Sequence, residues 1–312
     1  MRWFSPFPYF GGKFWLLNEL YNNIVPKIEH NTFVDVFGGS GKVVINYAKV
    51  LQRPKNRNKK IELVYNDKDI SLYAVFYSVK NKFSELNETL KERLKDVFDR
   101  GGGVKIIQKW REQIKNNEIN DLVELGAKTI ILYHSLYGGE FGNTIILNKK
   151  SILRLLTGRT EYLRKFYELA KDIKIYNKDY REIIKMYNRK DVLLFVDPPY
   201  LNFEKYYRCF ENRLAITSLE FIENNFTGSV IYTHNKDNEI EKILRKYNYE
   251  IKTMKRVSQV MDPENKEKKE EIIAIRKTRI VKKQKKKDFL DLLFDVNINT
   301  HKNNVTILDL FK

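Results

Sequence analysis

The 312-residue chain contains a single cysteine, and this scarcity already limits what the protein can be. Cys209 cannot form a disulfide within the chain or belong to a cysteine-cluster zinc site, which favours a reducing compartment. The four histidines are scattered without the spacing of metal ligands, so we expect no metal site. No apolar run approaches the length of a membrane span, and the first residues lack a signal-peptide hydrophobic segment. We therefore expect a cytoplasmic protein.

Negative charge is also in short supply. The chain has 40 Asp and Glu residues against 58 Lys and Arg, so its formal net charge is +18. This excess favours a polyanionic partner such as nucleic acid, although a lysine-rich composition can also follow from the composition of a genome. From Arg276 to Lys287 there are eight basic residues and no acidic one. We predict that this segment contacts phosphates without reading a base sequence.

The most informative stretch that the chain does contain is Val192–Tyr200. Its apolar first half, up to Val196, predicts a short strand buried on both faces. The strand must end at Asp197, because Pro198 and Pro199 can neither pair in a sheet nor begin a helix at once. Ligands of open α/β sheets bind at this end of the strands. A fixed carboxylate, backbone carbonyls and the final tyrosine ring would suit a planar group that bears an NH2. A plain proline turn is the alternative.

A glycine-rich segment lies near the N-terminus, where Tyr9 precedes Phe10, two glycines and Lys13. Paired glycines let a backbone approach a ligand closely. The apolar spacing that follows predicts a helix opened by Lys13, and the N–H groups at its start would favour an anion. Taken alone, a plain turn explains the segment as well.

A second glycine-rich segment, Thr32–Asn46, has the pattern of a strand, a loop and a helix. Its glycines are Gly38, Gly39 and Gly41. A phosphate-binding Walker loop would need Ser or Thr at the position of Val43, and a dinucleotide fingerprint would need glycine at Val44. The sequence therefore predicts a ligand loop of another kind.

Acidic residues follow two further predicted strands. Asp67 comes just after Ile61–Tyr65, where a carboxylate commonly accepts hydrogen bonds from both ribose hydroxyls, and Asp69 is expected to cap the next helix. Asp179 follows a strand that begins at Ile173. An exposed surface acid is the alternative for Asp67, and a helix cap is the alternative for Asp179.

In this order, the motifs resemble those of the Dam-like, D12 class adenine-N6-specific DNA methyltransferases. The matching segments are motif X at Tyr9–Lys13, motif I at Phe37–Gly41, motif II at Asp67, motif III at Asp179 and motif IV at Asp197–Tyr200. The match touches most of residues 5–275, and Val36 stands where the family often has proline. Each motif is weak alone, whereas five in order are specific.

The resemblance implies S-adenosylmethionine as cofactor. The residues that it assigns to cofactor binding are Tyr9, Lys13, Asp35, Phe37, Gly39, Gly41, Asp67, Asp179 and Asp197. Among them, Asp35 would lie near the methionine part, Asp67 near the ribose and Asp179 near the adenine. The residues that it assigns to catalysis are Asp197, Pro198, Pro199 and Tyr200.

The fold that the resemblance implies is a Rossmann-like α/β methyltransferase sheet with an inserted, mostly helical DNA-recognition subdomain. We assign residues 1–68 and 171–278 to the catalytic domain, 69–170 to the insertion and 279–312 to a basic C-terminal tail. Within the insertion, the segment Lys105–Lys115 is expected to form a basic aromatic patch around Trp110.

The predicted activity is methyl transfer to the N6 amino group of adenine in double-stranded DNA, from the nucleoid or a virus, after the base is flipped out. The base would stack on Tyr200, while Asp197 and the carbonyl of Pro198 accept hydrogen bonds from its NH2. Alternatives are cytosine-N4 methylation, methylation of RNA or of protein glutamine (where Asn usually replaces the motif IV acid), and DNA binding without catalysis. A cognate restriction endonuclease is a further candidate partner.

Three shorter segments carry lesser expectations. The aromatic residues Tyr206, Tyr207 and Phe210 would contact an extruded strand or belong to the core. The sequence Thr217–Glu220 is typical of a capping box at the start of a helix. Finally, Ile307–Phe311 loosely resembles peptides that dock on replication sliding clamps, and docking on the chain's own domain is the alternative.

Overall fold

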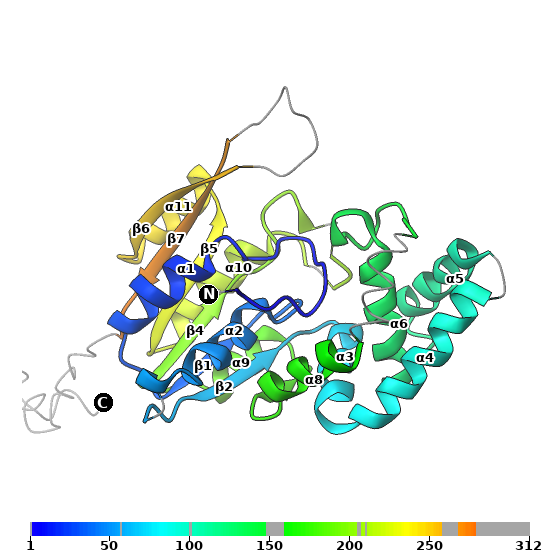
Figure 1. Ribbon diagram of the computed structural model, residues 1–312. Helices are drawn as coiled ribbons and strands as arrows, with labels where there is room; N and C mark the ends of the chain where they lie inside the picture. The colour runs from blue at the N-terminus through cyan, green and yellow to red at the C-terminus, as the bar shows by residue number, and fades with distance from the viewer. Residues whose placement is uncertain are drawn as a thin grey trace, which may run out of the picture. The chain divides into compact units, whose positions relative to one another are not determined.

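The computed structural model describes residues 2–56, 58–99, 102–147, 159–204, 207–209, 211–257 and 268–278. Within these ranges the chain forms a seven-stranded sheet flanked by helices (Figure 1). The strands are β1 (Thr32–Asp35), β2 (Glu62–Asn66), β3 (Lys174–Tyr176), β4 (Val192–Val196), β5 (Ser229–Asn235), β6 (Glu250–Val257) and β7 (Lys268–Arg276).

The strand order across the sheet is β3-β2-β1-β4-β5-β7-β6. Strands β1 to β5 are parallel, whereas β7 is antiparallel to both β5 and β6. The chain moves outward from β1 to β3 and then returns to β4 on the other side of β1. Ligands bind at such a reversal, in the crevice beyond the carboxyl ends of the strands. This order confirms the predicted Rossmann-like sheet.

Strand β4 is buried along its whole length because packed side chains cover both faces of the sheet. Leu193 and Phe195 belong to the core on one face, and Leu194 and Val196 to the core on the other. A strand covered on both faces has no place for alternating polar residues, which explains its unbroken apolar sequence. In the register with β1, Asp35 pairs with Phe195, so the ends of these two strands lie side by side.

Different helices supply the two cores. The first contains residues of α1 (Leu17–Glu19), α2 (Lys42–Leu51) and α3 (Ile70–Asn81). The second contains residues of α9 (Tyr180–Met186), α10 (Leu214–Asn225) and α11 (Asn238–Lys246). Three short helices complete the parallel half: η1 (Leu20–Ile24), η2 (Val25–Lys27) and η3 (Pro54–Asn56).

The long segment between β2 and β3 is helical in its described parts. After α3 it forms α4 (Phe83–Asp99), α5 (Gly103–Lys115), α6 (Leu122–Ser135), η4 (Tyr137–Gly139) and α8 (Arg159–Ala170). Figure 1 shows α4, α5 and α6 beside one end of the sheet, away from β6 and β7. Trp110 is buried in the core that these helices share with α2 and α3. The basic aromatic patch predicted for Lys105–Lys115 therefore does not expose its tryptophan ring. Residues 1–278 form one compact unit, and the predicted boundaries at 69 and 170 stay predictions.

Two predicted helix starts are wrong. The first helix begins at Leu17, and Lys13 lies before the turn at residues 14–16 that precedes it. Helix α10 begins at Leu214, after Arg213 with its left-handed φ of 57°. Thr217 therefore lies inside α10, where its hydroxyl donates to the carbonyl of Leu214 instead of capping an end. The first turn of α10 is buried in the second core, and burial outweighs the local capping pattern.

No helix in the described ranges is long and apolar enough to cross a membrane. Predictions about Tyr206, Phe210 and the tail from 279 to 312, including Ile307–Phe311, concern residues outside those ranges.

Candidate active site

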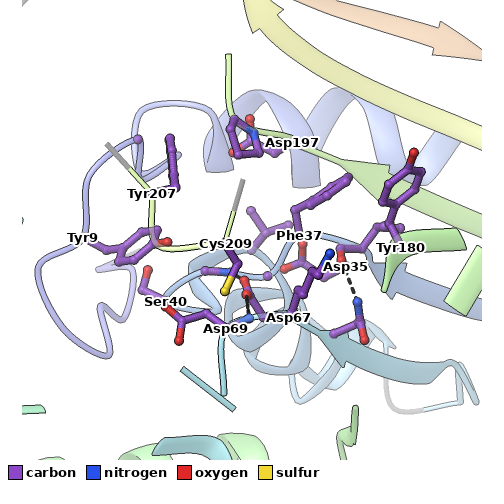
Figure 2. Close-up of a pocket in the computed structure, with 18 of the residues that line it drawn as sticks. Tyr9, Asp35, Phe37, Ser40, Asp67, Asp69, Tyr180, Asp197, Tyr207 and Cys209 are labelled. Carbon is purple, nitrogen blue, oxygen red and sulfur yellow. Dashed lines mark hydrogen bonds between the residues drawn. The ribbon is translucent and has the colours of Figure 1, made fainter. Parts of the chain in front are cut away.

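A pocket opens at the carboxyl ends of the parallel strands. Its walls come from the N-terminal loop, from the loops after β1, β2, β3 and β4, and from residues just before α10. Figure 2 shows Asp35, Asp67 and Asp197 around the cavity, with Tyr9 and Tyr207 at one side. The pocket therefore lies where the strand order predicts a ligand site.

The structure brings together residues from all five motifs. The predicted residues that line the pocket are Tyr9, Lys13, Asp35, Phe37, Gly39, Asp67, Asp179, Asp197 and Pro199. Gly41, Pro198 and Tyr200 are not among its lining residues.

Asp197 is held by two donors at the end of β4. The hydroxyl of Thr233, on β5, donates to Oδ1 at 2.7 Å, and the ammonium of Lys13 lies 2.7 Å from Oδ2. Burial raises the pKa of Asp197, while the charge and hydrogen bond of Lys13 oppose that rise. Each carboxylate oxygen has two lone pairs, so both can still accept a further hydrogen bond.

Lys13 connects the N-terminal loop to motif IV. Its side chain is 3% exposed and also donates to the carbonyl of Gly11 at 2.8 Å. The ammonium lies 4.8 Å from the centroid of the Tyr200 ring. The hydroxyl of Tyr200 in turn donates to Glu271 on β7 at 3.1 Å. Lys13 thus serves as the counter-ion of Asp197, a role that the expected helix start did not suggest.

Two glycines of the loop after β1 are required by their surroundings. Gly39 and Gly41 have φ values of 52° and 68°, in the left-handed region. A Cβ at Gly39 would lie 2.8 Å from Cε1 of Tyr9, and a Cβ at Gly41 would lie 2.1 Å from Cζ of Phe76. Gly39 therefore allows the Tyr9 ring to approach the loop, whereas Gly41 allows α2 to pack against α3.

Asp67 receives two backbone hydrogen bonds at the end of β2. The N–H of Gly39 donates to Oδ2 and the N–H of Asp69 to Oδ1, both at 2.8 Å. Burial, followed by the charge of Asp69, raises the pKa of Asp67 to about 7. Asp69 caps α3 as predicted, since its side chain accepts from the N–H of Ser71.

Asp35, at the end of β1, is 1% exposed. Burial raises the pKa of Asp35 well above its ordinary value, and the hydrogen bond from the N–H of Val44 at 3.3 Å works against this. The carboxylates of Asp197 and Asp67 raise it further. A cationic group bound in the pocket would relieve this repulsion.

Asp179 serves as the N-cap of α9, because its side chain accepts from the N–H of Arg181. It also belongs to an ion network on the rim of the pocket. Lys68 lies 3.1 Å from Asp179 and 3.3 Å from Glu211, and Arg181 lies 2.7 Å from Glu211. The helix-cap alternative is therefore correct, and it is compatible with a place beside a ligand.

Several lining residues were not assigned to the site from the sequence, among them Tyr180, Arg208, Cys209 and Glu211. Tyr207 had been expected to contact nucleic acid or the core, yet it lines the pocket, with its ring centroid 6.4 Å from that of Tyr9. Tyr180 is the first residue of α9, and the others lie between β4 and α10 without a motif of their own. Their only sequence signal is their position shortly after strand ends.

The pocket combines buried carboxylates, which accept hydrogen bonds, with the glycine-rich loop after β1. Asp35 and Asp67 can accept from hydroxyl or amino groups, and their raised pKa values show that added positive charge would be favourable. Asp197 lies at the edge, where it can accept from a second group. These features fit a positively charged nucleoside-like ligand next to a substrate that bears an NH2.

The family model for D12 class N6 adenine-specific DNA methyltransferases matches residues 9–260. This match includes every motif from Tyr9 to Tyr200 and extends beyond β6. A comparison with curated proteins found no match.

Proposed function

Because the chain belongs to the D12 class N6 adenine-specific DNA methyltransferases, and so methylates adenine N6 in DNA, we propose that the pocket at the sheet edge is its active site. The observation that carries this proposal is the environment of Asp197. Thr233 and Lys13 fix its carboxylate at the edge of a pocket that also contains Asp35 and Asp67. An acceptor for an amino group thus lies beside acceptors for a cofactor.

The pocket fits S-adenosylmethionine, whose use the family implies. We assign the ribose hydroxyls to Asp67, the amino group of the methionine part to Asp35, and the adenine to the rim around Asp179 and Tyr180. Gly39 leaves the space in which Tyr9 can cover the ligand. When bound, this cofactor supplies an electrophilic methyl group on a sulfonium.

Motif IV is proposed to orient the target base. Asp197 and the carbonyl of Pro198 accept hydrogen bonds from the two N6–H groups, which draws the nitrogen toward tetrahedral geometry and frees its lone pair for attack. The raised pKa of Asp197 makes its carboxylate a stronger acceptor than an exposed one. Fixed acceptors of this kind act without reorganising during the reaction. Stacking of the base on Tyr200 is part of the proposal, supported by the hydrogen bond to Glu271 that orients the ring.

A transfer assay tests this function. Full-length protein is incubated with methyl-labelled S-adenosylmethionine and mixed-sequence duplex DNA, and the DNA is digested to nucleosides. We expect labelled N6-methyladenine and no labelled cytosine. Cofactor binding without label in DNA, under conditions where DNA is bound, would contradict the proposed site. A cognate endonuclease and a sliding clamp stay predicted partners.

A further inference from the structure

His234, at the end of β5, contacts the catalytic loop through a hydrogen bond. The backbone N–H of Leu201 donates to Nε2 of His234 at 3.0 Å. The other ring nitrogen, Nδ1, lies 2.8 Å from the carbonyl oxygen of Asn235. A carbonyl can only accept, so Nδ1 carries the proton and Nε2 is the acceptor. The imidazole is therefore neutral and in one defined tautomer.

We propose that His234 is a positioning residue for methyl transfer, because its neutral ring holds the turn that presents Asp197 and the carbonyl of Pro198 to the target base. This inference rests on the proposed function of that turn. Protonation of Nε2 would replace the acceptor by a second donor facing the N–H of Leu201. The turn would then lose an anchor, and transfer would slow at acid pH.

Three side chains from the neighbouring strands hold the turn. Thr233 donates to Asp197 at its start, Glu271 accepts from Tyr200, and His234 accepts from Leu201 at its end. The ring of His234 also packs 4.7 Å from that of Tyr200. Among these anchors His234 is the one that holds the backbone itself. Since positions of reacting groups matter at the ångström scale, loss of such an anchor can cost a large factor in rate.

The surroundings keep the ring neutral near neutral pH. His234 is 1% exposed, and burial is the main effect that lowers its pKa. The hydrogen bond to the carbonyl of Asn235 works against this lowering, as do Asp237 before α11 and Glu204 after β4, while Lys13 of the N-terminal loop lowers the pKa further. Asp197 and Glu271 approach the same turn from β4 and β7. The net lowering places the protonation step below the ordinary histidine pKa of about 6.5.

Two substitutions distinguish the role of His234 as a hydrogen-bond acceptor from the effect of its protonation. His234→Gln keeps a side-chain oxygen that can accept from Leu201 but cannot be protonated in this range. His234→Phe removes the acceptor and keeps an aromatic ring. We expect His234→Phe to lower kcat about tenfold or more, with the KM for S-adenosylmethionine within about twofold of wild type. We expect His234→Gln to retain kcat at neutral pH and to shift the acid limb of the kcat profile to lower pH, where protonation of Asp197 alone limits the rate.

The control is His30→Gln, which changes a histidine bonded to Tyr47 and Ile28, both outside the pocket lining. It should leave kcat and its pH profile as in wild type. An unchanged kcat in His234→Phe, or a wild-type acid limb in His234→Gln, would overturn the proposal.

A measurement without catalysis keeps this inference separate from the proposed function. In 15N-labelled full-length protein, the His234 signals, assigned by their loss in His234→Gln, should show a protonated Nδ1 and an unprotonated Nε2 at neutral pH. The opposite tautomer would overturn the positioning role even if transfer occurs. Failure of wild type to methylate DNA, with the expected tautomer present, would instead reject the assigned function of the turn.

Discussion

At the scale of single residues, the environment of Asp197 determines what its substitution will do. Asp197→Asn puts an NH2 where Thr233 or Lys13 now donates, and it leaves the buried ammonium of Lys13 without its counter-ion. We expect transfer to fall by roughly 10²–10³-fold or more, the range seen on loss of one fixed polar group at a reacting centre. DNA affinity should stay within about twofold, because the carboxylate lies inside the pocket. Single-turnover methylation and fluorescence anisotropy measure the two quantities.

The matched control for this substitution is Asp191→Asn, at the opposite end of the same strand. Asp191 is 42% exposed and pairs with Arg189 at the surface. Its substitution should change neither transfer nor DNA binding. Substantial turnover by Asp197→Asn would contradict the acceptor role.

Asp67 predicts a pH dependence of cofactor binding. Only its ionised form accepts from two hydroxyls, and its pKa of about 7 means that ionisation is completed above neutral pH. Affinity for S-adenosylmethionine should therefore increase from about pH 6 to about pH 8. In Asp67→Asn it should be weaker and nearly constant over this interval. Calorimetric titration without DNA measures both, and a wild-type affinity independent of pH would reject the assignment.

The raised pKa of Asp67 also makes the stability of the fold depend on pH, and stability falls with rising pH where cofactor affinity rises. The folded state keeps a proton on Asp67 that the unfolded chain releases near the ordinary aspartate pKa of 3.8. This contribution to the free energy of unfolding is fully present below that pH and is lost as the pH rises through about 7. Above about pH 7, Asp67 therefore no longer stabilises the fold without a ligand, whereas the affinity for S-adenosylmethionine is expected to be highest there.

At the scale of elements, the loop between β1 and α2 depends on Gly41. Gly41→Ala combines a left-handed φ of 68° with a Cβ 2.1 Å from Phe76, whereas Gly102→Ala has a similar φ of 70° in open space. We expect Gly102→Ala to cost about 1–2 kcal/mol from the backbone alone. Gly41→Ala should cost about 1–3 kcal/mol more from overpacking. Urea unfolding measures this difference, with Gly142→Ala, also in open space without a positive φ, as the neutral control. Equal losses for Gly41→Ala and Gly102→Ala would contradict the steric argument.

Arg208 connects the loop after β4 to the helices between β2 and β3. Its guanidinium lies 2.6 Å from Oδ1 of Asp69 and donates to Asn117 at 2.9 Å and to the carbonyl of Ile114. Both charged side chains of the Asp69 pair are less than a tenth exposed. We expect Arg208→Met to destabilise the fold by about 3–5 kcal/mol, because it leaves a buried carboxylate without its partner.

A double-mutant cycle tests whether that loss comes from the ion pair. Asp69→Asn keeps a residue that caps helices well but removes the charge. In this background Arg208→Met should cost at least about 1 kcal/mol less than in wild type. Strictly additive effects in urea unfolding would show that Arg208 acts through packing, for example on the Phe141 ring 5.5 Å away.

At the scale of the whole molecule, the excess of positive charge predicts salt-dependent DNA binding. Replacing Lys282, Lys283 and Lys285 by Gln should reduce the slope of log affinity against log salt by up to about three, since each phosphate contact contributes roughly 0.9. The adenine specificity of methylation should not change, because phosphate contacts carry no base information. Replacing Lys55, Lys59 and Lys60, beside the amino end of β2, is a control of equal charge. Equal slopes for the two triple variants would contradict a role of the tail.

The sequence alone predicted the strands β1 to β4 and placed the candidate site at their carboxyl ends. The apolar run of β4 predicted a strand correctly because both faces of the sheet are covered. Every residue of the strand is buried, and every one is apolar. Its acid and prolines marked the strand end, and the order of the motifs indicated the family. Local patterns failed where packing competed with them, as at Thr217, which lies inside α10 because the preceding turn is buried.

Only the tertiary structure decided which distant side chains meet. Lys13 pairs with Asp197, His234 holds Leu201, and Arg208 reaches Asp69, yet no pattern in their own segments indicates these partners. Each contact depends on strand order and register, which bring separate loops to one edge of the sheet. The pattern of apolar residues along an element predicts which of them are buried, because each position of the element is either covered by the core or exposed. Partner choice depends on the relative placement of elements, which a local sequence pattern does not encode.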